Sequence, residues 1–179
     1  MCPASGWGQE AAFSKMHLEL RALANVAEDD FHSFWDHGRG GEALIETPFY
    51  RGHARLGLAV MPFHSATDEV PDFRSFFLYA GWGKAWTLPA NLSVFTGLDA
   101  GSFAMRFSAD TPGRTNSNET EVALRLNARL TYTLGDRWRL HLGASRQTVF
   151  TFKRFHLTFL SAGIGYTLKT PPWLVEVLR

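Results

Sequence analysis

Histidine and serine recur at spacings that raise the question of nucleophilic catalysis. His156 and Ser161 lie in one strand-like segment, but their odd separation puts the side chains on opposite faces of a strand. They therefore do not form a nucleophile–base pair. His141 and Ser145 share a face, with Asp99 as a conceivable third member, yet four residues span about 13 Å along a strand. That separation is too long for a hydrogen bond, so we predict no catalytic residues.

A second candidate for chemistry is the run "FHSFWDH" at residues 31–37. Its histidines, His32 and His37, and its aspartate, Asp36, are residue types that bind zinc. An ordinary loop of polar and aromatic residues is the simpler interpretation, and we expect no metal and no cofactor. Exposed aromatic side chains on a long loop can instead contact a partner. Three residues are candidates for such loop binding: Phe31, Phe34 and Trp35.

The length, net charge and composition of the chain limit the classes of protein to which it can belong. The chain has 179 residues, enough for one domain with a full core. Its formal net charge of +1 gives no electrostatic sign of a nucleic-acid partner, and none is expected. The single cysteine, Cys2, excludes an internal disulfide framework and a cysteine-based zinc site. No run approaches the roughly 18 apolar residues of a spanning helix, which leaves a soluble β protein or a membrane β-barrel.

The clearest structural signal is the stretch "VALRLNARLTYTLGDRWRLHLGA" at residues 122–144. On both sides of Gly135, apolar and polar residues alternate one by one, which indicates strands rather than a helix. Leucines such as Leu126 occupy one face, and arginines such as Arg125 occupy the other. The stretch therefore predicts a hairpin of two long strands.

Strand-like segments follow one another from residue 16 to residue 168 with no helical pattern between them. We expect strands at residues 16–26, 42–50, 52–63, 73–88, 92–108, 122–134, 138–152 and 153–168. The second is the weakest, because Pro48 cannot donate to a ladder. It is counted because bacterial single-chain barrels have an even number of strands. Short connections such as "LPAN" and "LGDR" alternate with long polar loops, which is typical of an up-and-down antiparallel barrel.

Periodicity alone leaves open which face of the strands meets water. In a soluble lipocalin-like barrel the apolar face lines the interior, whereas in a membrane barrel it meets lipid. The polar face here mixes Gly, Ala and Ser with Arg, Glu, Asp and His. Lysine, which is typical of surfaces in bulk water, is rare in the chain. We therefore expect the apolar face to meet lipid and the arginines to point into the lumen.

Two further patterns favour a membrane barrel. Aromatic residues mark a predicted membrane interface near the short turns and the end of the last strand: Tyr132, Trp138, Tyr166 and Trp173. The last strand also carries a polar residue, a glycine and two spaced bulky residues: Ser161, Gly163, Tyr166 and Leu168. This pattern resembles the β-signal that the barrel-assembly machinery reads on outer-membrane proteins, which implies that machinery as a partner during biogenesis.

Residues 16–168 thus resemble a small outer-membrane β-barrel of the OmpA and OmpX type. The resemblance implies an all-β, antiparallel up-and-down transmembrane β-barrel of 8 strands in the outer membrane of a Gram-negative cell envelope. It also implies contact with outer-membrane lipid and lipopolysaccharide. Side chains just fill an eight-stranded barrel, so charges in the lumen must neutralise one another. The expected lumen charge network comprises Glu19, Arg21, Arg55, Asp99, Glu121, Arg125, Arg129, Arg139 and His141.

The leading functional hypothesis is a non-enzymatic outer-membrane barrel. Its role would be structural or adhesive, or that of an accessory subunit that binds an envelope protein. Binding is expected at the long loops, residues 27–41 and 109–119. Three alternatives stay open. They are a soluble or periplasmic lipocalin-like barrel with an apolar ligand, a lipid A-modifying barrel enzyme, and a narrow anion pore, which an arginine-rich lumen would favour.

The two ends of the chain are expected to lie outside the barrel. Residues 1–15 contain small residues that resemble the end of a secretory signal, so this segment is a signal-peptide remnant or a polar N-terminal tail. In residues 169–179, two prolines break the last strand and the apolar residues after them lie at helical spacing. This pattern predicts a short C-terminal helical tail at the membrane interface.

Overall fold

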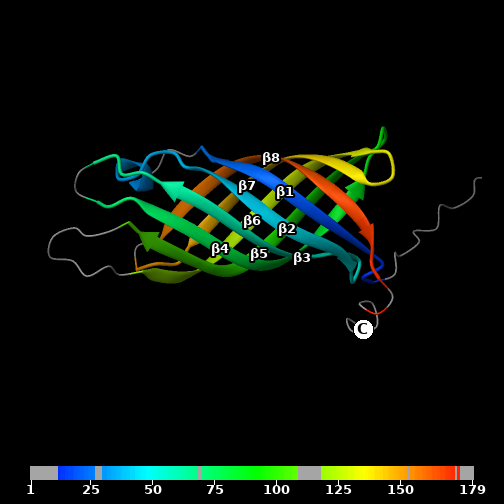
Figure 1. The fold of residues 1–179 in the computed structure, drawn as a ribbon, viewed down its shortest axis with the longest axis horizontal. Helices are drawn as coiled ribbons and strands as arrows, with labels where there is room; N and C mark the ends of the chain where they lie inside the picture. The colour runs from blue at the N-terminus through cyan, green and yellow to red at the C-terminus, as the bar shows by residue number, and fades with distance from the viewer. Residues whose placement is uncertain are drawn as a thin grey trace, which may run out of the picture.

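Eight antiparallel strands close into a barrel in chain order (Figure 1). The computed structural model describes residues 12–26, 30–67, 70–108, 118–152, 154–171 and Trp173. The strands are β1 (Lys15–Asn25), β2 (Arg39–Phe49), β3 (Gly52–Phe63), β4 (Phe73–Thr87), β5 (Leu92–Phe107), β6 (Glu119–Leu134), β7 (Trp138–Val149) and β8 (Phe155–Lys169). Each strand pairs with the next, and β8 pairs back with β1. The predicted up-and-down barrel of eight strands is confirmed.

Helical structure in the described residues is slight. One 3-10 helix, η1 (Asp30–Ser33), lies in the connection between β1 and β2. Among the residues described, no helix has the length and apolar character needed to cross a membrane.

The connections give the barrel two different ends. Three hairpins are closed by short turns at residues 50–51, 88–91 and 135–137, and we call this side the short-turn end. Tyr50 and Arg51 both have positive φ, 44° and 60°, as the two central residues of a tight hairpin require. The longer connections lie at the opposite loop end, which is on the left in Figure 1. The start of β1 and the end of β8 lie at the short-turn end (Figure 1).

Strand β2 is regular, although the sequence marks it as the weakest. It begins at Arg39, three residues before the predicted start, and Pro48 is its penultimate residue. The ladder between β1 and β2 ends at the pair His17 and Glu46, two residues before Pro48. The missing proline N–H therefore costs no bond to β1, and the Pro48 carbonyl accepts a bond of 2.9 Å from the N–H of Phe13.

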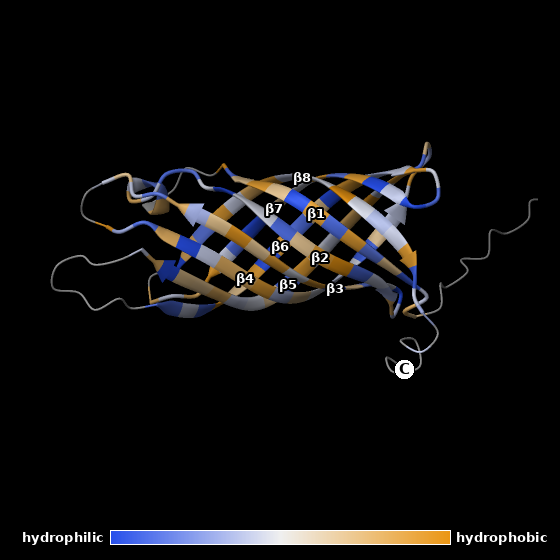
Figure 2. Ribbon diagram, viewed as in Figure 1, coloured by the Kyte–Doolittle hydropathy of each residue, from blue (hydrophilic) through white to orange (hydrophobic). Residues whose placement is uncertain are grey.

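The apolar face of the strands points outward. Leu20, Leu126 and Leu142 are between 62% and 65% exposed, whereas Glu19 is 2% and Asp99 0% exposed. Figure 2 shows the resulting alternation of hydrophobic and hydrophilic residues along the strands. A soluble barrel that carries an apolar ligand in its interior requires the opposite arrangement, so the structure contradicts that alternative.

Side chains fill the lumen in two layers. Toward the short-turn end the layer is charged. Toward the loop end it is apolar, and its buried members include Met61, Phe63, Phe73, Phe77, Phe103, Met105, Leu157 and Phe159. The sequence predicts the charged layer but not the apolar one. The reason lies in β4, where the neighbours Phe76 and Phe77 leave the inward-facing parity ambiguous.

The predicted terminal segments lie mostly outside the described residues. Of residues 1–15, residues 1–11 lie outside them, and Lys15 already belongs to β1. In residues 169–179, β8 extends to Lys169, and the span of the predicted interfacial helix is outside the described residues apart from the exposed Trp173.

Candidate functional site

Carboxylates and guanidinium groups alternate in one continuous chain of ion pairs across the lumen. Its members, in order of contact, are Glu46, Arg129, Glu19, Arg21, Glu42, Arg125, Asp99 and Arg55. Four formal negative charges face four formal positive charges, so this chain of ion pairs is neutral. Buried charges are tolerated only when each is paired and hydrogen-bonded, and the alternation meets that condition. We call this set the lumen network.

Arg129 on β6 joins two carboxylates from two other strands. Its Nη1 lies 2.8 Å from Oε1 of Glu19, and its Nη2 lies 2.9 Å from Oε2 of Glu46. The guanidinium carbon also lies 4.7 Å from the centre of the Phe95 ring. A planar guanidinium can make paired hydrogen bonds and stack on a ring at once, which an ammonium group cannot do.

Arg125 repeats this arrangement one layer nearer the loop end. Its Nη2 donates to Oε1 of Glu42 at 2.6 Å, and its Nε donates to Oδ2 of Asp99 at 3.0 Å. Its guanidinium carbon is 4.3 Å from the centre of the Tyr79 ring. The Tyr79 hydroxyl donates to the same Glu42 oxygen at 2.8 Å. Glu42 thus receives hydrogen bonds from strands on both sides of the lumen.

Two of the four carboxylates in the lumen network are absent from the predicted set. Glu42 and Glu46 lie on β2, the segment weakened by Pro48 in the sequence. The signal that could have found them is their spacing of four within "EALIET", which puts both on the inward face with Leu44 between them.

The lumen network is closed to solvent. The side chains of Arg55, Asp99 and Glu19 are 0% exposed. Solvent therefore does not reach these described side chains at the centre of the lumen network. The arginines that suggested an anion pore are matched by carboxylates, so the geometry gives no support to that alternative.

The remaining predicted lumen residues lie at the edges of the lumen network. Arg139 on β7 and Glu121 on β6 are half-buried on inward-facing positions. Glu121 is opposite Phe103 in the register and four residues, about 13 Å, from Arg125 along the strand. Glu121 therefore stands beside the apolar layer, whereas the sequence places it with the arginines.

His141 lies between a hydroxyl and a carboxylate. Its Nδ1 is 3.0 Å from Oγ1 of Thr131, and its Nε2 is 3.5 Å from Oε1 of Glu19. This order of groups matches that of a nucleophile, base and acid. All three residues are at most 3% exposed, however, which leaves no room for a substrate. The candidates His156 and Ser161 lie on opposite faces of β8, the former exposed outward and the latter inward.

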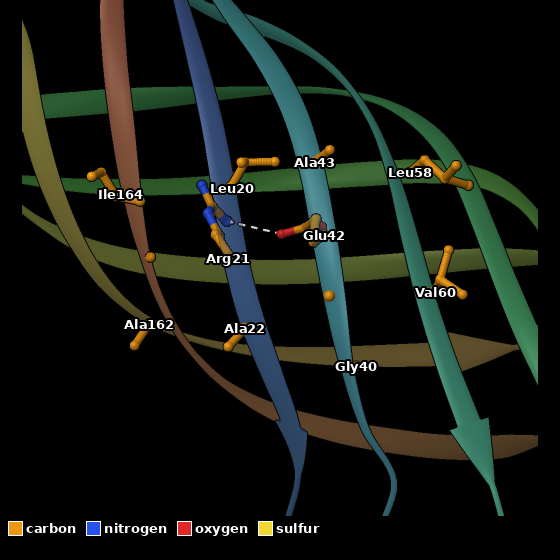
Figure 3. Close-up of a pocket in the computed structure, with 12 residues that line it drawn as sticks. Leu20, Arg21, Ala22, Gly40, Glu42, Ala43, Leu58, Val60, Ala162 and Ile164 are labelled. Carbon is orange, nitrogen blue, oxygen red and sulfur yellow. Dashed lines mark hydrogen bonds and ion pairs between the residues drawn. The ribbon is translucent and has the colours of Figure 1, made fainter.

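The wall over the Arg21–Glu42 ion pair is lined by small residues. Figure 3 shows this part of β1 and β2, with Ala22, Ala43 and Ala162 around the pair. The outer surface forms a shallow depression of about 690 Å³ there. The depression is apolar and open, so it belongs to the lipid-facing surface rather than to a closed ligand cavity.

Aromatic side chains cover the loop end of the lumen. Phe31 of η1 stacks on Trp35 and Phe155 with ring centres 5.0 and 5.1 Å apart. Its ring also meets the edge of Phe63 at 5.2 Å. Trp35 is tied to the next long connection, because its Nε1 donates to the carbonyl of Pro71 at 3.0 Å. These contacts form a cap over the apolar layer.

The cap changes the interpretation of the loop-binding residues. Phe31 is 6% exposed and belongs to the core, so its predicted role as an exposed contact is wrong. Trp35 is partly buried against the same core, and Phe34 is exposed. Of the predicted loops, residues 39–41 belong to β2, and residues 27–29 and 109–117 lie outside the described residues.

The rings of two nearby histidines lie close together at a tilt of 38°. The ring centres of His32 and His37 are 4.2 Å apart. Nδ1 of His32 lies 2.9 Å from the backbone oxygen of Trp35. Within the described ranges, no three His, Cys, Asp or Glu side chains converge as a metal site requires.

Outward-facing aromatics gather at the short-turn end. Tyr132 and Trp138 are exposed, and the rings of Trp138 and Tyr166 meet edge to face at 4.9 Å. Trp82 and Trp86, which the prediction omits, are also exposed on this side. These positions suit a membrane interface.

The residues of the predicted assembly signal all lie on β8, where they divide between its two faces. Ser161 and Gly163 point inward, and Leu168 is exposed. A Cβ at Gly163 would lie 2.7 Å from Cγ of Arg21, so glycine leaves room for the lumen network.

The comparison with solved structures supports the fold. No protein-family model matches the sequence, and no curated protein matches it either. Among solved structures, Neisserial surface protein A aligns with a TM-score of 0.59 at 13% identity, covering 89% of this chain and 99% of that one. OprG from Pseudomonas aeruginosa aligns with a TM-score of 0.61 at 9% identity, covering 90% and 99%.

A third structure is Ail from Yersinia pestis, solved in complex with the heparin analogue sucrose octasulfate. It aligns with a TM-score of 0.56 at 16% identity, covering 86% of this chain and 98% of that one. Identities this low establish architecture and leave ligands undetermined. The chain has the fold of the small eight-stranded outer-membrane β-barrels of Gram-negative bacteria.

Proposed function

We propose that the protein is a non-enzymatic outer-membrane barrel that anchors a binding surface at its loop end. The observation that carries this proposal is the filled lumen beneath an exposed apolar wall. The side chains of Arg55 and Asp99 in the lumen network are 0% exposed, whereas Leu126 on the outer face is 64% exposed. A barrel filled in this way holds its loops rigidly in place and conducts no solute. Contact with an external or envelope partner then falls to the loop end.

The loop end offers a defined starting point for partner contact. Phe34 is 42% exposed beside the buried Phe31, and its carbonyl and N–H bond to Ala66 and Phe31. An exposed aromatic residue on a hydrogen-bonded backbone loses little entropy on binding. We therefore place adhesive or accessory contact at this cap.

Orientation in the cell tests this proposal. In a Cys2→Ser background, a cysteine is placed at Phe34 on the loop end or at Asp136 in the short turn between β6 and β7. Intact cells are treated with a membrane-impermeant maleimide. Labelling of the first variant alone is expected, and the Asp136 variant should react only after lysis. Labelling of Asp136→Cys on intact cells would contradict the proposal.

Conductance tests the filled lumen separately. The purified barrel is inserted into a planar lipid bilayer, and currents are recorded under an applied potential. We expect no discrete open-channel steps. Stable anion-selective steps would instead restore the pore hypothesis.

A further inference from the structure

Two arginines face each other on the outer surface of the barrel at the loop end. Arg74 on β4 and Arg106 on β5 are register partners, and both side chains are exposed. Their neighbours Phe73 and Phe107, also register partners, take the inward-facing parity. The two arginines therefore point outward, side by side. Directly opposed like charges destabilise an antiparallel pair, so this position calls for a counter-charge.

The described surroundings do not supply that counter-charge. Asp72 lies two residues from Arg74, but its Oδ2 is 3.0 Å from Nδ1 of His64 and its Oδ1 accepts from the N–H of Ser65 at 2.7 Å. Within the described ranges, neither Arg74 nor Arg106 has a carboxylate within ion-pair distance. As far as the described residues show, the two guanidinium groups are available to an external anion.

The height of the pair on the barrel indicates where that anion comes from. On β4, the outward positions between Arg74 and Lys84 are Phe76, Leu78, Ala80 and Trp82. Ten residues span roughly 33 Å along a strand, which is about 25 Å along the membrane normal at the usual strand tilt. This matches the height of the lipid-facing band of outer-membrane barrels. Arg74 and Arg106 therefore lie at the level of the lipid headgroups on the loop side.

The chemistry of the pair suits a phosphate group. Each guanidinium presents parallel N–H donors that match two oxygens of a phosphate. Two such groups on adjacent strands, whose Cβ atoms are about 5 Å apart in an antiparallel pair, can share one phosphate. The exposed Leu78 lies below them on the same face, where an acyl chain attached to the headgroup would pack. This combination favours an amphiphile over a soluble sulfated glycan.

We propose that Arg74 and Arg106 form a clamp for the phosphate of an acylated, phosphorylated outer-leaflet lipid, the chemistry of the lipid A part of lipopolysaccharide. The clamp rests on the proposed function, because it requires the loop end to face the outer leaflet. Bound phosphate converts a destabilising like-charge pair into a bridged one. The folded barrel is then more stable in a leaflet that contains this lipid than in a zwitterionic one.

The test uses the full chain in phosphatidylcholine nanodiscs. Bisphosphorylated lipid A is titrated in, and the bound fraction is measured by native mass spectrometry. The double variant Arg74→Gln/Arg106→Gln is compared with Arg146→Gln. Arg146 is an outward, exposed arginine on β7 whose register partners are Leu126 and Thr158, so it lacks an opposing cation. The heat-dependent gel mobility shift verifies that each variant is folded.

The expected result is lipid A binding that is about a hundredfold weaker in the double variant, since it loses two charge-assisted contacts and each is worth roughly one factor of ten. Arg146→Gln should bind as the unmodified chain does. Without lipid A, the double variant should unfold at the same temperature as the unmodified chain or a higher one, because removing the charges relieves repulsion. A merely structural role for the arginines would instead lower that temperature.

Three outcomes would overturn the clamp. The first is equal lipid A binding by the unmodified chain and the double variant. The second is binding of dephosphorylated lipid A, and the third is displacement of lipid A by inorganic phosphate at the concentration at which lipid A binds. Nanodisc binding does not depend on orientation in the cell. Failure of the clamp therefore leaves the labelling result for the loop end intact, and failure of that labelling leaves the binding result intact.

Discussion

Arg125 and Glu42 are 83 residues apart in the sequence and 2.6 Å apart between Nη2 and Oε1. They come from β6 and β2, which are not neighbours in the barrel, so the contact crosses the lumen. Ties of this kind hold opposite walls together in a way that the hydrogen-bonded ladders between adjacent strands do not. The lumen network therefore adds ties across the barrel to those around its wall.

Removing Glu42 should be costly. Glu42→Ala leaves Arg21 and Arg125 without a carboxylate that both now share, and an uncompensated buried charge costs about 3–5 kcal/mol. The measurement is the free energy of unfolding in urea, with gel mobility as the readout. Glu121→Ala is the matched control, because Glu121 lies outside the lumen network, and it should change stability much less. Equal losses for the two variants would contradict the central role of Glu42.

A glycine beside His141 should not tolerate a methyl group. A Cβ at Gly165 would lie 2.7 Å from Nε2 of His141 and 3.2 Å from Cγ of Glu19. Gly165→Ala should therefore lower the free energy of unfolding by about 1–3 kcal/mol, as overpacking does. In Gly41→Ala the nearest described atom would be 3.7 Å away, so that variant is the control. A Gly165→Ala barrel as stable as Gly41→Ala would show that the lumen has spare room.

The two phenylalanines of the first long connection should behave differently. Phe31→Ala removes a ring packed between Trp35 and Phe155 and should cost about 3 kcal/mol. Phe34→Ala removes an exposed ring and should change stability by no more than about 0.5 kcal/mol. Hydrogen exchange of the backbone over residues 30–36 measures the loosening of the cap. Similar exchange in both variants would place Phe31 outside the cap.

Asp72 should make the connection between β3 and β4 sensitive to acid. The N–H of Ser65 and the side chain of His64 both bond to its carboxylate, and they lower the pKa of Asp72 below its ordinary value. A lowered folded-state pKa stabilises the fold above the unfolded-state pKa, and this contribution is lost as pH falls through the folded-state value. The protection of the amides of residues 64–67 against exchange, corrected for the intrinsic pH dependence of exchange, should therefore decrease as pH falls below about 4, the ordinary pKa of an aspartate.

Asp72→Asn separates this effect from general acid unfolding. The variant should show fast exchange at residues 64–67 already at neutral pH and little further change in acid. If its pH dependence matched that of the unmodified chain, another group would be responsible.

Period-two alternation was sufficient to predict most of the strands and which residues share a face, whereas the choice of the outward face also needed the composition of the two faces and the scarcity of lysine. Because side chains in a strand alternate with a period of two, Leu126 and Arg125 must take opposite sides. The partners within the lumen were harder to predict. Arg129 reaches Glu19 and Glu46 from strands that are not its neighbours, and such cross-lumen distances depend on the stagger of all eight strands.

The aromatic cap is a second feature that could not be predicted from the sequence. Phe31 and Phe34 have the same residue type, three positions apart in a polar loop. Only the fold shows that Phe31 enters the space between Phe63 and Phe155 while Phe34 stays exposed. A loop residue's burial depends on which strands end beneath it, and local composition carries no such information.

The most direct test of the account is the accessibility of the two faces in a lipid bilayer. In a Cys2→Ser background, a nitroxide is attached at Leu142→Cys on the outer face or at Ser145→Cys on the inner face of β7. Collision rates with oxygen, which concentrates in lipid, and with a water-soluble nickel complex are then measured. High oxygen contact with low nickel contact is predicted at residue 142, and low contact with both probes at residue 145. Nickel contact at residue 142, or oxygen contact confined to residue 145, would invert the faces and contradict the membrane barrel.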